Sequence, residues 1–177
     1  MRIRPLRLIA SALLASALLL GGPTPRPAKS LELQPVNAQK VALEDLRGKA
    51  VMVMFFSTDC PHCQEAARTL APLYEKYKPQ GFEVLALAMN PSAEQNLKQF
   101  IETYDVEYPT GYATRSEFSR FSELSVMERF YYPYLIFVDP SGTVRAEHQG
   151  GDRQFFGNLA ESLEATIQGL LKHKSRS

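Results

Sequence analysis

Ten residues at positions 54–63 decide the fold of this chain: Met54-Phe55-Phe56-Ser57-Thr58-Asp59-Cys60-Pro61-His62-Cys63. They contain the only two cysteines of the 177-residue chain, separated by two residues. An apolar run from Val51 to Phe56 precedes the pair, and residues 63–78 carry apolar side chains at helical spacing. A C-x-x-C pair at a strand-to-helix junction is typical of a redox-active dithiol rather than of a structural disulfide.

The side chains around the pair are expected to tune it. Cys60 falls at the predicted start of a helix, where unpaired N–H groups and the helix dipole favour a thiolate. Pro61 suits an early helical position because no hydrogen bond is lost there. His62 is expected to add a donor or a positive charge near Cys60, whereas the carboxylate of Asp59 acts in the opposite sense. The sequence leaves open which effect dominates.

The first thirty residues differ from the rest. Arg2, Arg4 and Arg7 precede an uncharged run of thirteen residues, Leu8 to Leu20. This pattern predicts a secretory signal peptide, since a spanning helix needs roughly 20 apolar residues. An uncleaved membrane anchor over residues 8–22 and a buried N-terminal helix stay open as alternatives. We therefore expect a signal or anchor plus linker at residues 1–29 and one domain at residues 30–177.

The net charge of the domain limits the classes of partner to be expected, and the leader indicates the compartment. Five of the 20 basic residues and none of the 19 acidic ones lie in residues 1–29, so the remainder carries a net charge of −4. Nucleic-acid binding, which needs a basic face, is therefore not expected. An extracytoplasmic compartment, periplasmic or secreted, permits thiol–disulfide chemistry, so the leader and the cysteine pair support each other.

Hydrophobic periodicity predicts the elements of the domain. The buried strands are expected at 51–56, 82–89 and 134–138, because these runs are apolar on both faces. Further strands are expected at 31–33 and 41–43 (an edge hairpin), 108–112 and 143–148, and helices at 63–78, 90–104, 116–124 and 156–171. This order predicts an α/β protein with a central mixed sheet and helices on both faces.

Four landmarks resemble the thioredoxin superfamily, and within it the TlpA/ResA-like extracytoplasmic thiol–disulfide oxidoreductases. They are Gly48 to Val51, the strand with its C-x-x-C, Gly81 to Tyr104, and Tyr132 to Gly142. The resemblance implies a thioredoxin-like fold in which Pro133 is the cis-proline. It also implies that the backbone of Tyr132 pairs with a substrate strand.

The resemblance further implies an enzyme that exchanges disulfides with cysteine-containing protein substrates and needs no cofactor or metal. Cys60 is then the nucleophile and Cys63 the resolving thiol. Family members lean towards reducing roles, such as electron delivery to apocytochrome c, and are recycled by a redox partner in the membrane. Most members carry Trp where this chain has Asp59, and many carry Glu where it has Ala66. Whether the protein reduces or oxidises its substrates therefore stays open.

Other interpretations of the same residues also stay open. A metallochaperone would hold Cu(I) on Cys60 and Cys63, because thiolates favour soft metals. A peroxiredoxin-like peroxidase would need a Thr-x-x-Cys arrangement after a proline, but Ser57 stands at the threonine position. The tyrosines 131, 132 and 134 are either a docking surface or packing. Glu65 is interpreted as a solvated first-turn helix residue, and His148 and His173 as surface residues.

Overall fold

The structure is a computed structural model that describes residues 25–173. Helices and strands alternate along this range much as the hydrophobic pattern predicts. Their bounds are β1 (Arg26–Pro27), β2 (Glu32–Leu33), β3 (Val41–Ala42), η1 (Leu43–Leu46), β4 (Ala50–Phe56), α1 (Pro61–Tyr77), η2 (Lys78–Gln80), β5 (Phe82–Ala88), α2 (Ala93–Thr103), β6 (Thr110–Tyr112), α3 (Arg115–Ser122), β7 (Tyr134–Val138), β8 (Thr143–Gln149), α4 (Arg153–Phe156) and α5 (Leu159–His173).

A six-stranded mixed sheet in the order β1-β8-β7-β4-β5-β6 forms the centre of the molecule. β4 pairs in parallel with β5 and antiparallel with β7, so the strand that leads to the cysteines is central. Every residue of β4, β5 and β7 is buried, as expected for apolar strands that are covered on both faces. The predicted α/β class and the central mixed sheet are confirmed.

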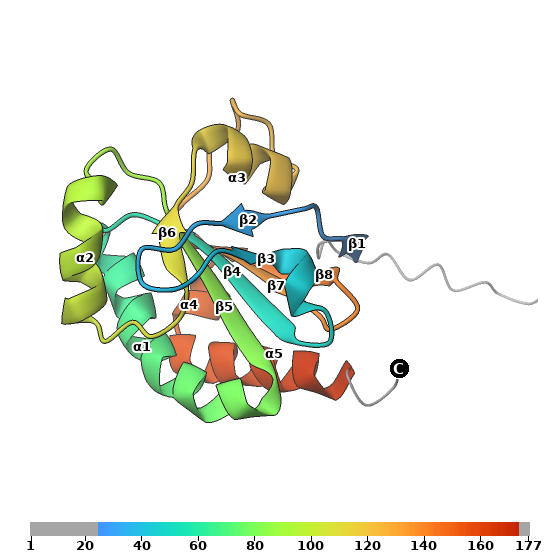
Figure 1. Cartoon of the computed structure of the whole chain (residues 1–177). Coiled ribbons are helices and arrows are strands. Elements are labelled where there is room, and N and C mark those ends of the chain that lie inside the picture. Colours follow the sequence, from blue (N-terminus) through green and yellow to red (C-terminus); the bar gives the residue numbers. More distant parts are fainter. Residues whose placement is uncertain (1–24, 174–177) are drawn as a thin grey trace, which may run out of the picture.

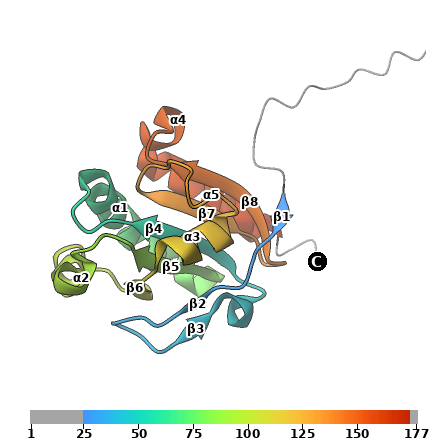
Figure 2. The same ribbon diagram turned by 90° about the horizontal axis from the view of Figure 1, so that it is seen from above.

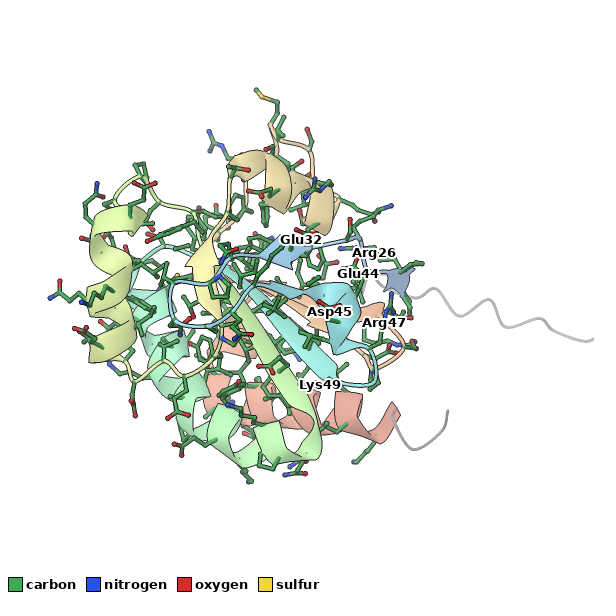
Figure 3. The ribbon with its side chains drawn as sticks, in the orientation of Figure 1. Arg26, Glu32, Glu44, Asp45, Arg47 and Lys49 are labelled. Atoms are coloured by element: carbon green, nitrogen blue, oxygen red, sulfur yellow. The ribbon has the colours of Figure 1, made fainter. Side chains whose placement is uncertain are left out.

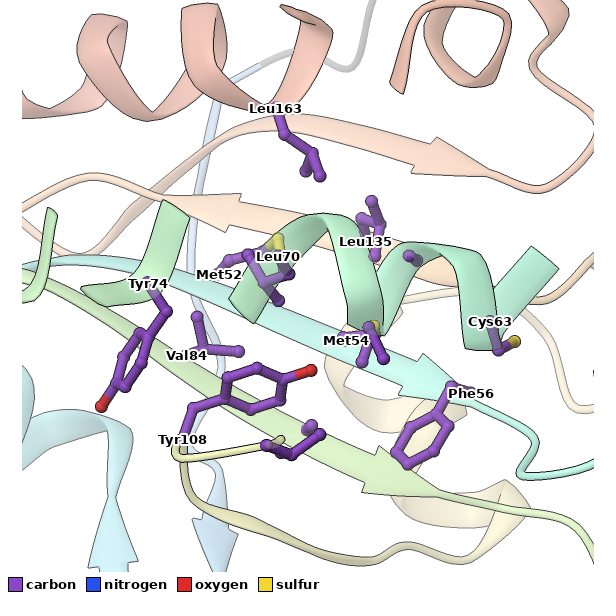
Figure 4. Packing of buried hydrophobic residues seen from close by; sticks show 14 of the residues in the cluster. Met52, Met54, Phe56, Cys63, Leu70, Tyr74, Val84, Tyr108, Leu135 and Leu163 are labelled. Atoms are coloured by element: carbon purple, nitrogen blue, oxygen red, sulfur yellow. The ribbon is translucent and has the colours of Figure 1, made fainter. Parts of the chain in front are cut away.

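The two faces of the sheet are covered by different elements. Helices α1 and α5 pack on one face, and α3 with the β2–β3 hairpin covers the other (Figures 1 and 2). A hydrophobic core lies on each face: the first core under α1 and α5, and the second core under α3 and the β2–β3 hairpin. Alternate residues of β4 point to opposite faces, so Met54 lies in the first core and Phe55 in the second. Cys63 lies at one end of the first core, near Phe56 (Figure 4). The cysteine pair is thus attached to the best-buried part of the fold.

The first strand of the sheet lies in a stretch that the sequence predicts to be a linker. Residues 1–24, which include the predicted signal or anchor, lie outside the described residues. Arg26 and Pro27, which the sequence places in the linker, pair with Val144 and Thr143 at the start of β8. Arg26 lies at this edge of the sheet (Figure 3) and makes an ion pair with Glu147 at 2.6 Å. Within residues 25–173, no helix is both long and apolar enough to cross a membrane.

Candidate active site at the start of helix α1

The turn after β4 places the first cysteine at the N-cap of α1. Cys60 has an extended backbone (φ −87°, ψ 119°), and Pro61 is the first helical residue. The N–H groups of Cys63 and Gln64 both donate to the Cys60 carbonyl at 3.0 Å. The positive end of the helix dipole therefore faces the Cys60 side chain, and the proline costs no hydrogen bond.

The two cysteines have unequal environments. Cys60 is half-buried and Cys63 fully buried, and the two are not joined by a disulfide. Burial raises the pKa of the Cys63 thiol far above its ordinary value. A hydrogen bond with the Ser57 backbone opposes this effect, and the nearby Cys60 adds a smaller increase. Cys63 is therefore held as a thiol, and Cys60 is the sulfur that a partner can reach.

Asp59 is fixed by a polar network that the sequence did not reveal. Its carboxylate accepts hydrogen bonds from Ser92 Oγ (2.6 Å), Asn90 Nδ2 (3.0 Å) and Asn96 Nδ2 (3.0 Å). These bonds, the one from Ser92 most of all, hold the pKa of Asp59 below its ordinary value. The Thr58 N–H also donates to Asn90 Oδ1 at 3.0 Å, so the turn before Cys60 is tied to the start of α2. Asp59, the residue before the first cysteine, is thus held as a carboxylate against the start of α2.

His62 and Glu65 face each other on the exposed surface of α1. His62 Nδ1 lies 3.9 Å from Glu65 Oε2, and both side chains are more than 60% exposed. Glu65 is solvated, as expected, but it lies one residue beyond the first turn because the helix begins at Pro61. The imidazole therefore has a carboxylate within reach, which offsets the positive charge expected to act on Cys60. Its tuning role stays a prediction.

The predicted cis-proline segment lies beside the cysteines. The peptide bond between Tyr132 and Pro133 is cis. Tyr132 is half-buried against the first core, and burial, then the neighbouring cysteines, raise the pKa of its hydroxyl. Tyr131 is 63% exposed, whereas Tyr134 is buried and donates a hydrogen bond to Glu147 Oε2 at 2.8 Å. Tyr134 is therefore a packing residue, whereas a docking role for Tyr131 and Tyr132 and substrate pairing at the Tyr132 backbone stay predictions.

Residues at the end of β8 hold the backbone of the cis-proline segment through hydrogen bonds. Gln149 Oε1 accepts a hydrogen bond from the Tyr131 N–H at 3.0 Å, and the Gly150 N–H donates to the Tyr131 carbonyl at 3.2 Å. A Cβ at Gly150 would lie 2.1 Å from the Tyr132 carbonyl oxygen, so only glycine allows this approach. The sequence signal was the Gly150-Gly151 pair, which the periodicity did not distinguish from an ordinary turn.

The interpretation of His148 as a surface residue was wrong. Its side chain is only 24% exposed, its Nδ1 lies 2.7 Å from Asp152 Oδ2, and its ring stacks on Phe155 at 3.8 Å. The partners lie four and seven residues further along the chain, where a turn folds α4 back over β8. The side chain of His173 lies outside the described residues. Among the described residues, no cluster of three or more His, Cys, Asp or Glu side chains forms a metal site.

Fold and site together define a thioredoxin-fold protein with a cysteine pair at the start of its first long helix. Residues 25–147 match the AhpC/TSA family, and the chain belongs to that family. This match begins at β1 and includes both cysteines and the cis-proline.

Curated relatives resemble the chain in sequence, and solved structures resemble it in fold. The thiol-disulfide oxidoreductase ResA of Oceanobacillus iheyensis is 30% identical over 66% of this chain and 58% of that protein. The ResA of Bacillus subtilis is 26% identical over 82% of this chain and 74% of that protein. The chain spans about half the length of several other ResA relatives that it matches. The thiol:disulfide interchange protein from Chlorobium tepidum has the same fold, with a TM-score of 0.71 at 24% identity over 84% of this chain and 97% of that one.

Proposed function

We propose that this protein is a thiol–disulfide oxidoreductase that exchanges disulfides with cysteine-containing proteins. The observation that carries the proposal is the asymmetry of the pair: Cys60 is accessible at the helix N-terminus, and Cys63 is buried one turn further on as a thiol. Inert cysteines need neither this junction nor this difference. The names of the ResA relatives support the same activity.

In the reducing direction, the Cys60 thiolate attacks one sulfur of a substrate disulfide. The substrate S–S bond breaks, a mixed disulfide forms, and the other substrate sulfur leaves with the electron pair. This leaving thiolate can accept the proton of Cys63. The Cys63 sulfur then attacks Cys60, which releases the second substrate thiol and leaves a Cys60–Cys63 disulfide. Two electrons have passed to the substrate.

We propose reduction as the physiological direction. A carboxylate held in place at Asp59, the residue before Cys60, supports a low reduction potential, because negative charge near a dithiol opposes its conversion to thiolate. The neighbour of His62 is Glu65, so the opposing effect of the imidazole is weakened. We therefore expect a potential nearer the roughly −270 mV of a reductant such as thioredoxin than the roughly −120 mV of an oxidant such as DsbA.

The proposal includes an extracytoplasmic location, with residues 1–29 as signal peptide or anchor. Supporting it are the basic start and apolar run of the sequence, and the solved structure of a secreted Mycobacterium tuberculosis disulfide oxidoreductase, with the same fold at a TM-score of 0.62. Clients in cytochrome c maturation and a membrane redox partner that returns electrons complete the proposal.

Trapping of mixed disulfides tests the roles of the two sulfurs. Cys63→Ser is expected to accumulate a mixed disulfide with disulfide-containing client proteins or with insulin, and Cys60→Ser is the matched control that accumulates none. The wild-type chain should reduce insulin in the presence of dithiothreitol. Trapping through Cys63 would overturn the assignment of the nucleophile. Tight Cu(I) binding or rapid peroxide consumption without disulfide exchange would favour the metallochaperone or the peroxidase instead.

A further inference from the structure

The loop from Glu123 to Pro133, between α3 and β7, leads into the cis peptide and exposes apolar side chains. Val126 is 54% exposed, Met127 87% and Tyr131 63%. No helix or strand runs through these residues. A loop of this kind keeps a defined shape only if other groups hold its backbone, because it makes no regular hydrogen-bond ladder of its own.

Arg115, the first residue of α3, holds the backbone of this loop. Its Nη2 donates to the carbonyl of Val126 (3.1 Å), and its Nε donates to the same oxygen at 3.3 Å. The same Nη2 lies 3.5 Å from the Ser125 carbonyl and donates to the Glu128 carbonyl. A guanidinium is suited to this task because its planar donors reach several acceptors at once.

The same guanidinium also lies over aromatic rings that lead to the site. Its Cζ is 4.4 Å from the ring centre of Phe130 and 5.2 Å from that of Phe118. Phe118 and Phe130 stack at 4.2 Å, and Phe130 meets Tyr132 edge-to-face at 5.0 Å. Tyr132 packs against the core that contains Cys63. An unbroken set of contacts therefore runs from Arg115 to the residue before the cis-proline.

We propose that Arg115 is a positioning residue: it holds the loop from Glu123 to Pro133, and Tyr132 within it, in the position near Cys60 that a protein substrate needs for docking. The inference rests on the proposed function and adds a determinant of substrate recognition to it. Arg115 bonds to loop carbonyls and to rings rather than to either sulfur. It therefore acts on the affinity for a protein substrate and leaves the thiol chemistry itself unchanged.

The test compares a protein disulfide with a small disulfide in the same variants. Arg115→Met is expected to raise KM for insulin about tenfold with little change in kcat. The rate with 5,5′-dithiobis(2-nitrobenzoate) and the glutathione equilibrium should stay within twofold of the wild type. Arg115→Lys keeps the charge but cannot bridge three carbonyls, so it should restore less than half of the lost kcat/KM. Arg120→Met, an exposed arginine on the same helix, is the matched control and should behave as the wild type.

Amide hydrogen exchange separates failure of this inference from failure of the proposed function. In Arg115→Met, amides of residues 126–132 should exchange at least tenfold faster while those of β4 do not change. This readout needs no enzymatic activity, so it tests the loop even if the wild-type chain fails to reduce insulin. Unchanged exchange in the loop would overturn the inference. So would equal loss of rate with the protein and the small disulfide, or full rescue by lysine.

Discussion

Replacing Arg26 by methionine is expected to destabilise the whole domain, although the residue lies at its N-terminal edge. The Arg26 guanidinium makes a 2.6 Å ion pair with Glu147, donates to the Ser122 carbonyl at 3.3 Å and lies 3.4 Å from Glu123. The side chains of Arg26 and Glu147 are only 17% and 11% exposed. Methionine keeps the apolar stem but leaves the Glu147 carboxylate with the Tyr134 hydroxyl as its remaining hydrogen-bond donor among the described residues.

The size of the expected loss of stability follows from the charge that stays buried without its partner. Removing one partner of a fully buried ion pair costs about 3–5 kcal/mol. Both side chains here keep some contact with solvent, and Arg26 Nη1 is buried without a partner among the described residues, so its removal recovers part of the loss. We expect a decrease of about 2–3 kcal/mol in the free energy of unfolding. For a domain of this size, that corresponds to a fall in Tm of about 5–10 °C.

Urea unfolding followed by far-UV circular dichroism measures the loss, since the chain has no tryptophan. Adding Glu147→Gln to Arg26→Met should recover about 1 kcal/mol or more, because the unpaired buried charge is removed as well. Lys29→Met is the matched control: its pair with Glu123 is about half exposed and should contribute less than about 1 kcal/mol. A chain that begins at residue 30 lacks Arg26 and the rest of β1, so it should be at least as destabilised as Arg26→Met.

Two results would refute this reasoning. The first is a change of less than about 0.5 kcal/mol in Arg26→Met, the size of an ordinary surface substitution. The second is a double variant no more stable than the single one, which would show that the carboxylate is not stranded by loss of the arginine.

Two further predictions concern the end of β8. Hydrogen bonding from His148, with smaller contributions from backbone N–H groups, lowers the pKa of Asp152, so its stabilising contribution is present above the ordinary aspartate range near pH 4 and is lost as pH falls through the lower folded-state value. Asp152→Asn should therefore reduce the loss of stability at acid pH, measured as the urea midpoint between pH 3 and 7. An unchanged pH dependence of the midpoint would contradict the assignment. Gly150→Ala places a Cβ 2.1 Å from the Tyr132 carbonyl oxygen, so insulin reduction should fall at least tenfold. Wild-type turnover by this variant would show that the segment adapts without cost.

The central strands and the cysteine pair could be predicted from sequence because their signals are local. Burial on both faces makes β4 and β7 continuous apolar runs, and the junction after β4 is marked by Cys60 and Pro61. The cis bond at Pro133 was expected only through the family resemblance, since nothing in the residues alone distinguishes it from an edge proline.

The polar partners of the site could not be predicted in the same way. Asp59 meets Ser92 and Asn96 across more than thirty residues, and Arg26 meets Glu147 across 121. Periodicity records which face of an element is buried, but not which polar groups the fold brings together. The strand at Arg26 was missed for a related reason: two residues in a proline-rich stretch carry no pattern, and β8 alone supplies their hydrogen bonds.

The pairing of β1 divides β8 into two stretches with different partners. β1 joins the sheet beside Thr143 and Val144, whereas the cis-proline segment lies at the opposite end of β8, next to Gln149 and Gly150. Six residue steps along an extended strand separate these ends by about 20 Å. Because β1 and β8 are antiparallel, the chain runs along β1 away from the cis-proline segment. The strand that anchors the described N-terminus and the segment expected to meet substrates therefore occupy different stretches of β8.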